Sequence, residues 1–297
     1  MKGSTMLTNR LNLPQTFVDA ATSDHEYKPN RYSVTEVLGG TCEAVLKRRH
    51  AGEATEDVSD RLWALLGTAV HKVLESAQSG PEQHQEQWLC VKVGDYELSG
   101  IFDLYDDATG TVTDWKVTSV YTVLFGDFEK WRKQTLAYCW MLRQKGHGAH
   151  RGQIVAMLRD HNMRKARTER DYPPHPVFTI EWDFTEDDFK AIESDIFAWF
   201  GEVWHQEITD DNELVPCIPE QRWHKPDKWA VMKDGRKRAV RVFEDEEQAV
   251  SLLNQLKESD QGHHIEFRQG EDTRCQSYCS VAQFCPYGQK FFEEIED

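Results

Sequence analysis

A run of strand-forming residues in the first half of the sequence constrains the fold more than any other feature. Two segments, residues 88–93 and 96–103, flank a turn at Gly94-Asp95, and a third, residues 111–117, follows a turn at Thr109-Gly110. Strands that follow one another with such short connections pair with their neighbours. The sequence therefore predicts an antiparallel meander of three strands.

Helical periodicity frames this meander on both sides. Apolar residues recur at helical spacing over residues 59–77 before the meander and over residues 128–145 after it, and the second helix is expected to end at Gly146. The elements expected after it are a strand at 154–158, a strand at 177–182 and a helix at 186–204. Together these elements are expected to form one unit.

The remaining sequence is expected to form an N-terminal arm and a C-terminal elaboration of the core. Residues 1 to about 30 are polar and turn-rich, which predicts an extended arm or a frayed tail. The segment Pro216-Cys217-Ile218-Pro219 marks a boundary, after which a hairpin over 229–242 and a helix over 245–257 are expected. The predicted parts are an N-terminal arm (1–30), a core (31–210) and a C-terminal hairpin and helix elaboration with a cysteine-rich tail (211–297).

Composition narrows the class of protein. The 297 residues include 35 Lys and Arg against 51 Asp and Glu, for a net charge of −16, and 33 aromatic residues that can build a core. No stretch approaches the roughly 20 apolar residues of a membrane-spanning helix, and the N-terminus lacks a signal-like apolar region, so we expect a cytoplasmic protein without membrane contact. Any binding of nucleic acid would have to use local basic patches.

Acidic residues and a lysine lie on two neighbouring predicted strands. Asp114 and Lys116 are two apart on one strand, so both side chains leave the same face. Asp103 lies within an apolar run on the preceding strand, where an unpaired carboxylate would be costly. Two carboxylates and an ammonium suit a hard cation such as Mg²⁺. The alternative interpretation is a buried salt bridge between Asp114 and Lys116.

The two framing helices add polar residues to this arrangement. His71 lies beside the apolar stripe of the first helix, and Gln134 and Tyr138 are four apart on the second, so they share a face. Alone, each would be interpreted as a boundary or packing residue. The order of the parts is more informative: a helix with His, a strand with Asp, a strand with Asp-x-Lys, and a helix with Gln-x-x-x-Tyr.

This order resembles the PD-(D/E)XK nuclease superfamily, specifically its RecB-like exonuclease branch, over about residues 30–210. The matching segments are Gly67-Thr-Ala-Val-His71, Gly100-Ile-Phe-Asp103, Thr113-Asp-Trp-Lys116 and Gln134-Thr-Leu-Ala-Tyr138. Phe102 replaces the proline of the superfamily's name, a departure that is frequent in this branch. The resemblance implies an α/β, restriction-endonuclease-like fold, in which helices flank a mixed sheet.

The resemblance also implies a metal-dependent DNA exonuclease that acts on ends or single strands. It implies Mg²⁺ or Mn²⁺ at His71, Asp103 and Asp114, with Lys116 assisting hydrolysis and Gln134 and Tyr138 positioning the substrate; a backbone carbonyl of Trp115 or Val117 is a further candidate ligand. The chain looks like phage-encoded members that act in the host cytoplasm in replication, recombination or repair, where a protein partner is expected. The alternative is a non-catalytic module that binds nucleic acid or a partner and keeps the fold.

Three of the seven cysteines cluster near the C-terminus. Cys275, Cys279, Cys285 and the following Pro286 resemble the cysteine triad of iron–sulfur members of the same branch, although the first pair is separated by three residues instead of two. A [4Fe–4S] cluster normally takes four thiolates. The alternatives are a structural zinc with the same ligands, a zinc site that includes His263 or His264, or reduced thiols.

The fourth ligand of such a cluster is expected to be Cys217 or Cys42. Cys42 lies near the start of the fold, where iron–sulfur relatives place a lone cysteine. Cys217 lies between two prolines, and a rigid loop loses less entropy on ligation. We favour Cys217.

Basic residues gather in two segments, at 159–170 and 225–241. A run of charge usually marks a solvated face, but these two stand out in an acidic chain. We expect them to contact DNA phosphates. The candidate DNA-binding residues are Arg164, Lys165, Arg167, Lys233, Arg236, Lys237 and Arg238.

Overall fold

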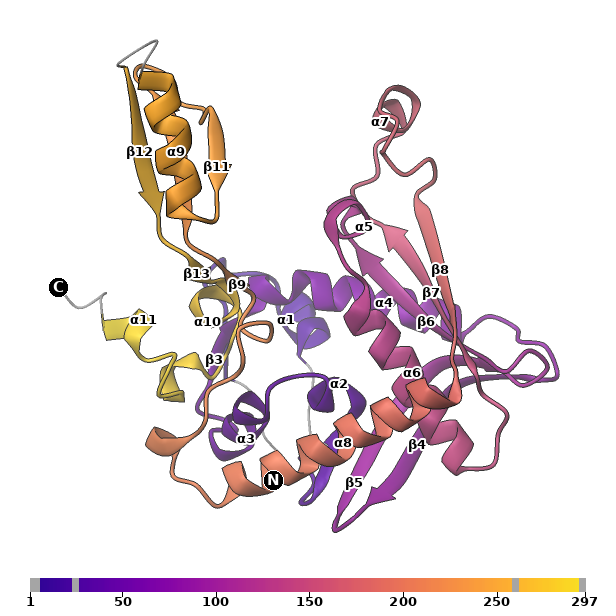
Figure 1. Cartoon of the computed structure of the whole chain (residues 1–297). Coiled ribbons are helices and arrows are strands. Elements are labelled where there is room, and N and C mark those ends of the chain that lie inside the picture. The colour runs from indigo at the N-terminus through magenta and orange to yellow at the C-terminus, as the bar shows by residue number, and fades with distance from the viewer. Residues whose placement is uncertain (1–5, 23–26, 258–261, 294–297) are drawn as a thin grey trace. The chain divides into compact units, whose positions relative to one another are not determined.

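The computed structural model of the chain describes residues 6–22, 27–257 and 262–293. It divides into two compact units, residues 1–210 and 211–297 (Figure 1). Residues 1–5 and 23–26 of the predicted arm, and residues 294–297 of the predicted tail, lie outside the described residues.

The first unit is a mixed α/β arrangement. Its elements are, in chain order, β1 (Met6–Thr8), α1 (Gln15–Ala21), β2 (Arg31–Ser33), α2 (Val34–Val37), α3 (Thr41–Arg49), β3 (Thr55–Asp57), a 3-10 turn (Val58–Arg61), α4 (Leu62–Glu75), β4 (Gln83–Val93), β5 (Tyr96–Asp106), β6 (Thr111–Thr118), α5 (Val120–Phe125), α6 (Glu129–Gln144), β7 (Arg151–Leu158), α7 (Met163–Thr168), β8 (Val177–Asp183) and α8 (Glu186–Glu207).

The central sheet confirms the predicted mixed topology. Strands β4, β5 and β6 form the antiparallel meander, β7 runs parallel to β6, and β8 runs antiparallel to β7. The strand order is β2-β5-β6-β7-β8, and β4 pairs with β5. Helices α3, α6 and α8 pack with this sheet around one large core that includes Phe102, Met141 and Ile196.

Strand β5 is paired unevenly along its length. Its pairing with β4 extends from Tyr96 to Asp106, whereas β2 pairs only with residues 97–99 and β6 only with residues 104–106. Residues 100–103 lie between the segments that pair with β2 and β6. The sheet therefore divides at the part of β5 that carries the predicted acidic motif.

Segments of the region expected to form the N-terminal arm (1–30) are ordered. Strand β1 pairs in parallel with β3, and residues 15–21 form α1. Asp57 holds this region: its carboxylate accepts hydrogen bonds from the Thr8 hydroxyl at 2.8 Å and from the Arg10 backbone N–H at 2.9 Å. The same carboxylate caps the 3-10 turn through the Ser59 N–H. This cap displaces the start of the regular helix from the predicted Ser59 to Leu62.

The second unit contains a small sheet with one long helix. Its elements are a 3-10 turn (Asp211–Glu213), β9 (His224–Lys225), β10 (Lys228–Lys233), β11 (Arg241–Phe243), α9 (Glu246–Lys257), β12 (His263–Arg268), β13 (Glu271–Asp272), α10 (Thr273–Ser277), a 3-10 turn (Ala282–Phe284) and α11 (Lys290–Glu293). Strand β10 lies between β11 and β12, so a third strand joins the predicted hairpin.

Asp272 organises the tail of the second unit. This buried carboxylate accepts a hydrogen bond from the Tyr287 hydroxyl and lies 3.0 Å from His224 Nδ1 and 3.3 Å from Arg222 Nε. Burying a carboxylate is favourable only with partners of this kind. Polar contacts thus connect the cysteine-bearing tail to β9. Among the described residues of both units, no helix is long and apolar enough to cross a membrane.

Helix α6 approaches β7 closely at Gly152. A Cβ atom at this position would lie 2.4 Å from Thr135 Oγ1 and 2.9 Å from Phe184 Cε2. Real Cβ atoms do not approach other atoms so closely, so a larger residue would push the helix away from the sheet.

We predict that Gly152→Ala lowers the free energy of unfolding by about 1–3 kcal/mol, the usual result of overpacking a core. The matched control is Gly201→Ala on α8, where a Cβ atom would meet nothing within 4 Å. Alanine there should raise the stability by roughly 0.5–1 kcal/mol, because it removes a flexible glycine from a helix. Urea denaturation of the two variants measures both values, and equal effects would contradict the packing argument.

Candidate active site

Asp103 lies where both strand ladders of β5 are interrupted. The β4–β5 register passes from Gln85↔Leu104 to Gln87↔Phe102, and the β5–β6 register stops at Leu104↔Thr113. Continuing these registers places Glu86 and Asp114 directly opposite Asp103. Instead of a backbone bond across β5 and β6, the Asp103 carboxylate accepts the Trp115 N–H at 2.7 Å.

Three side chains from three elements converge at this interruption. His71 of α4, Glu86 of β4 and Asp103 of β5 each place a ligand-type atom within 4.8 Å of the others. His71 Nδ1 lies 3.2 Å from Asp103 Oδ1 and 3.9 Å from Glu86 Oε1. One nitrogen and two carboxylates form a donor set suited to a divalent cation.

The backbone of Glu86 has an unusual conformation. Its φ angle is +50°, in the left-handed region that non-glycine residues rarely adopt. Such a conformation costs energy and persists only where its surroundings impose it, often at functional sites. Like charges directly opposite each other on paired strands are also unfavourable, so Glu86 and Asp103 together favour a cation between them.

The environment of His71 supports the same conclusion. Its Nε2 lies 3.1 Å from the Trp115 carbonyl oxygen, while its Nδ1 faces Asp103 and Glu86. A neutral imidazole can donate from only one nitrogen, so the other nitrogen needs either a second proton or a bound cation. The hydrogen bond to Asp103 raises the pKa of His71, and burial together with the Asp103 charge raises the pKa of Glu86. The Asp103 carboxylate thus contributes to both shifts, in addition to the burial of Glu86.

Asp114, Lys116 and Gln134 form a second, adjoining group. Lys116 Nζ lies 2.6 Å from Asp114 Oδ2 and donates to Gln134 Oε1 at 2.9 Å, and Gln134 Nε2 donates to Asp114 Oδ1 at 2.8 Å. Each member contacts the other two, so the lysine ammonium is held in place. Burial raises the pKa of Asp114, and the neighbouring Lys116 opposes that shift.

Asp114 has one oxygen that is not fully satisfied. The atom Oδ2 is buried and accepts no hydrogen bond of good geometry in the described structure, although Lys116 lies close to it. A buried carboxylate oxygen usually has a well-aligned donor or a metal ion. This atom therefore fits the interpretation of Asp114 as a metal ligand.

Tyr138 packs directly over β5. A Cβ atom at Gly100 would lie 2.7 Å from Tyr138 Cε1, so only glycine leaves room for this ring. At Gly67, the glycine of the helical motif, a Cβ atom would meet nothing within 4 Å. Of these two motif glycines, Gly100 therefore has a packing role.

The structure brings together all of the predicted active-site side chains and adds one that the sequence interpretation missed. The predicted metal set was His71, Asp103 and Asp114, and the role of each stays a prediction. The group whose ligand-type atoms all lie within 4.8 Å of one another contains Glu86 with His71 and Asp103. The Trp115 carbonyl also lies at the site, beside His71.

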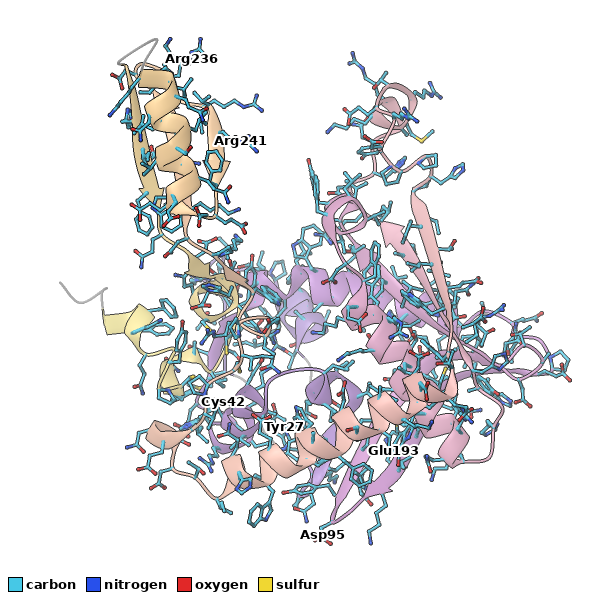
Figure 2. All side chains as sticks on the ribbon, viewed as in Figure 1. Tyr27, Cys42, Asp95, Glu193, Arg236 and Arg241 are labelled. Carbon is cyan, nitrogen blue, oxygen red and sulfur yellow. The ribbon has the colours of Figure 1, made fainter. Side chains whose placement is uncertain are left out.

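The predicted cysteine ligands separate into the two units. Cys217, Cys275, Cys279 and Cys285 lie in the second unit. Burial raises the pKa of Cys275 to about 11, and the nearby thiols of Cys217 and Cys285 contribute to this shift, which places the three cysteines near one another. Cys42 is buried in α3 of the first unit (Figure 2). His264 pairs with Asp234 at 2.8 Å.

The predicted DNA-binding residues lie on short, exposed segments. Arg164, Lys165 and Arg167 belong to α7 in the first unit. The others lie at the end of β10 and in the connection to β11, and Figure 2 shows Arg236 of this connection and Arg241, the first residue of β11, pointing outward. The residues of the second group are Lys233, Arg236, Lys237 and Arg238.

Comparison with known proteins gives one extensive match. The family described as the PD-(D/E)XK nuclease superfamily matches residues 81–286. No curated protein matches the chain. The crystal structure of SSO0001 is similar with a TM-score of 0.44 and 18% identity over 61% of this chain and 78% of that one. A phage-related exonuclease from Haemophilus somnus 129PT gives a TM-score of 0.28 and 10% identity over 56% and 74% of the two chains.

We predict that Mn²⁺ raises the melting temperature of the protein by on the order of 5 °C at saturating concentration, because a ligand that binds only the folded state stabilises it. Glu86→Gln should reduce this shift and should raise the melting temperature in EDTA, because it removes a charge that faces Asp103. Asp95→Asn, in the exposed turn between β4 and β5, is the control (Figure 2). Thermal unfolding with Mn²⁺ or EDTA measures both effects, and an unchanged shift in Glu86→Gln would remove this residue from the metal site.

Proposed function

Because the chain belongs to the PD-(D/E)XK nuclease superfamily, we propose that it is an Mg²⁺- or Mn²⁺-dependent DNA exonuclease of the RecB-like branch. Its substrate is a DNA end or a single strand, and its reaction is hydrolysis of a phosphodiester bond. The context that we propose is phage or host DNA replication, recombination or repair in the cytoplasm, together with a protein partner.

One observation carries the catalytic part of this proposal. The metal-type group of His71, Glu86 and Asp103 adjoins the Asp114–Lys116–Gln134 group through the Trp115 backbone. A buried salt bridge alone would explain Asp114 and Lys116. It would not explain two further carboxylates and a histidine held against them in a strained strand.

The residues that would hold the metal are His71, Glu86, Asp103 and Asp114. A divalent ion bound there would supply positive charge to the scissile phosphate and lower the pKa of a bound water. Lys116 contributes a fixed ammonium, which orients the attacking water and offsets negative charge that develops on the phosphate. Gln134 forms hydrogen bonds with both Lys116 and Asp114, so it fixes the position of the ammonium relative to the carboxylate. Tyr138 lies over Gly100 beside them and positions the substrate.

The alternative function is a non-catalytic module that binds nucleic acid or a partner. A module of this kind has no need for an intact acidic set. The presence of Asp103, Asp114 and Lys116 with their supporting contacts favours the enzyme.

We further propose that the second unit binds a [4Fe–4S] cluster through Cys217, Cys275, Cys279 and Cys285. The proximity of Cys217 and Cys285 to Cys275 supports this set.

We predict that Asp103→Ala, Asp114→Ala and Lys116→Ala each abolish cleavage while leaving folding and DNA binding largely intact. Residues that act as one unit give non-additive losses, so double variants should be no less active than single ones. His71→Ala should weaken the response to metal more gently, and Gln134→Ala or Tyr138→Ala should chiefly impair substrate positioning. The measurement uses end-labelled single- and double-stranded DNA with Mg²⁺, Mn²⁺ or EDTA.

The control for this experiment is Asp188→Ala on α8, since that residue caps the helix and pairs with Arg132 away from the metal-type group. This variant should lose some stability and keep its activity at low temperature. Strong cleavage by Asp114→Ala would refute the assignment of the site.

The proposed [4Fe–4S] cluster leads to a separate prediction about the metal content of the protein. Anaerobically purified protein should contain iron and acid-labile sulfide, Cys217→Ser should lose both, and Cys42→Ser should retain them, because Cys42 is a buried core residue of α3. Iron, sulfide and zinc assays on the three proteins give the answer. Loss of iron only in Cys42→Ser would reverse our choice of ligand, and zinc without sulfide would replace the iron–sulfur cluster with a structural zinc site.

A further inference from the structure

Helix α5 exposes two aromatic rings instead of burying them. Val120 is buried, and Val123 and Leu124 pack against the core cluster that contains Ile154 and Leu158 of β7 and the buried Tyr172. On the opposite side, Tyr121 is 56% exposed and Phe125 is 80% exposed. The aliphatic residues therefore anchor the helix, and its largest apolar side chains face solvent.

The two exposed rings are aligned. Tyr121 and Phe125 are four residues apart on α5, their ring centroids are 6.1 Å apart, and their planes differ by only 10°. Parallel, exposed ring faces on an anchored helix are suited to stacking on another planar group. A purely hydrophobic contact would not need this alignment.

The basic segment after β7 is tied to the start of α5. The Asp160 carboxylate accepts hydrogen bonds from the Val120 N–H at 2.7 Å and from the Ser119 hydroxyl at 2.6 Å. Ala166 of α7 packs against the same cluster as Val123 and Leu124. The exposed cations of α7 are thus held beside the exposed rings of α5, and Figure 1 shows the two helices at the same end of the sheet.

A third exposed aromatic residue reaches this region from α4. Trp63 is 57% exposed, and the guanidinium carbon of Arg159 lies 4.3 Å from the centroid of its ring. The Arg159 N–H donates to the Thr118 carbonyl oxygen at 2.9 Å, at the end of β6 and two residues beyond Lys116. The aromatic and basic residues therefore border the end of the strand that carries the candidate catalytic lysine.

We propose that Trp63, Tyr121 and Phe125 form an aromatic ledge on which the bases of a single-stranded DNA end stack. The phosphates of that strand contact Arg159 and the cations of α7: Arg164, Lys165 and Arg167. This inference rests on the proposed nuclease function and specifies how the substrate is positioned. Aligned aromatic faces beside a basic segment are the combination that binds single strands, because every base has a stacking face and every nucleotide has a negative charge.

The occupant is a single strand and not a duplex or an apolar protein surface. In a duplex the base faces are stacked on one another and only the terminal pair of an end has a free face, so three exposed rings have far less to contact than on a single strand. An apolar protein partner would gain nothing from the cations of α7, whereas a polyanion is attracted by them within an otherwise acidic chain.

Binding is measured in EDTA, so that cleavage does not enter, by fluorescence anisotropy with a labelled single strand and a labelled blunt duplex. Tyr121→Ala and Phe125→Ala should each weaken binding of the single strand by about 5- to 150-fold, which corresponds to the loss of one stacked base, and should change duplex binding by less than about 2-fold. Trp204→Ala, which removes another exposed aromatic residue from α8, should leave both affinities unchanged.

Two further variants separate stacking from apolar contact. Tyr121→Leu and Phe125→Leu keep an apolar surface but have no ring, so they should bind as weakly as the alanine variants, and Tyr121→Phe should bind like the wild type. If the leucine variants bind like the wild type, the ledge is an apolar docking surface and the proposal is wrong. Thermal unfolding shows whether each variant is folded.

A strand without bases provides the complementary test. The wild type should bind an abasic oligonucleotide as weakly as a Trp63→Ala/Tyr121→Ala/Phe125→Ala triple variant, which lacks all three rings of the ledge, binds a normal strand. The two losses should not add, because both remove the same contacts. Additive losses would overturn the proposal. If the protein cleaves DNA but the ledge variants bind normally, this inference fails alone; if binding depends on the ledge but no metal supports cleavage, the proposed nuclease function fails instead.

Discussion

The hydrogen bond from the Trp115 N–H to the Asp103 carboxylate determines how the candidate site is built. This side-chain contact stands where a backbone ladder would otherwise join β5 to β6, and it lets the two strands diverge at Asp103 and Asp114. The same bond leaves the other Asp103 oxygen directed at His71. The Asp103 carboxylate thus replaces the backbone pairing of β5 with β6 and also contributes an oxygen to the metal-type group. Both effects require an acidic residue within an otherwise apolar strand.

Much of the fold and of the site could be predicted from the sequence because the informative signals are local. The meander and the two framing helices follow from turns and periodicity, and the side-chain alternation of β6 explains why Asp114 and Lys116 share a face. The position of Glu86 opposite Asp103 could also have been predicted. The two-residue turn at Gly94-Asp95 fixes the register of β4 and β5, and counting back from that turn places Glu86 opposite Asp103. The signal was present in the spacing, but no residue pattern around Glu86 drew attention to it.

Other parts could not be predicted because they depend on contacts between distant residues. The pairing of β1 with β3 involves only short strands and is held by Asp57, whose partners Thr8 and Arg10 lie more than forty residues earlier in the chain. Strand β12 has only two apolar residues, Ile265 and Phe267, and this short alternation is too weak to predict a strand by itself; the pairing with β10 stabilises it. Its pairing is a tertiary effect that overrides weak local preference.

The position of helix α6 shows how packing prepares the chemistry. Thr135 rests on Gly152 of β7 and Tyr138 rests on Gly100 of β5, so two glycines let the helix approach the sheet on either side of its division. Gln134 immediately precedes Thr135, and its amide holds both Asp114 and Lys116. A displacement of α6 by a fraction of an ångström would therefore change the hydrogen bonds of the lysine as well as the packing of the core. Sites held to this tolerance need rigid support from their surroundings. In this chain Gly100 and Gly152 have no side chain, so α6 can pack closely against the sheet, and this close packing holds the helix in place.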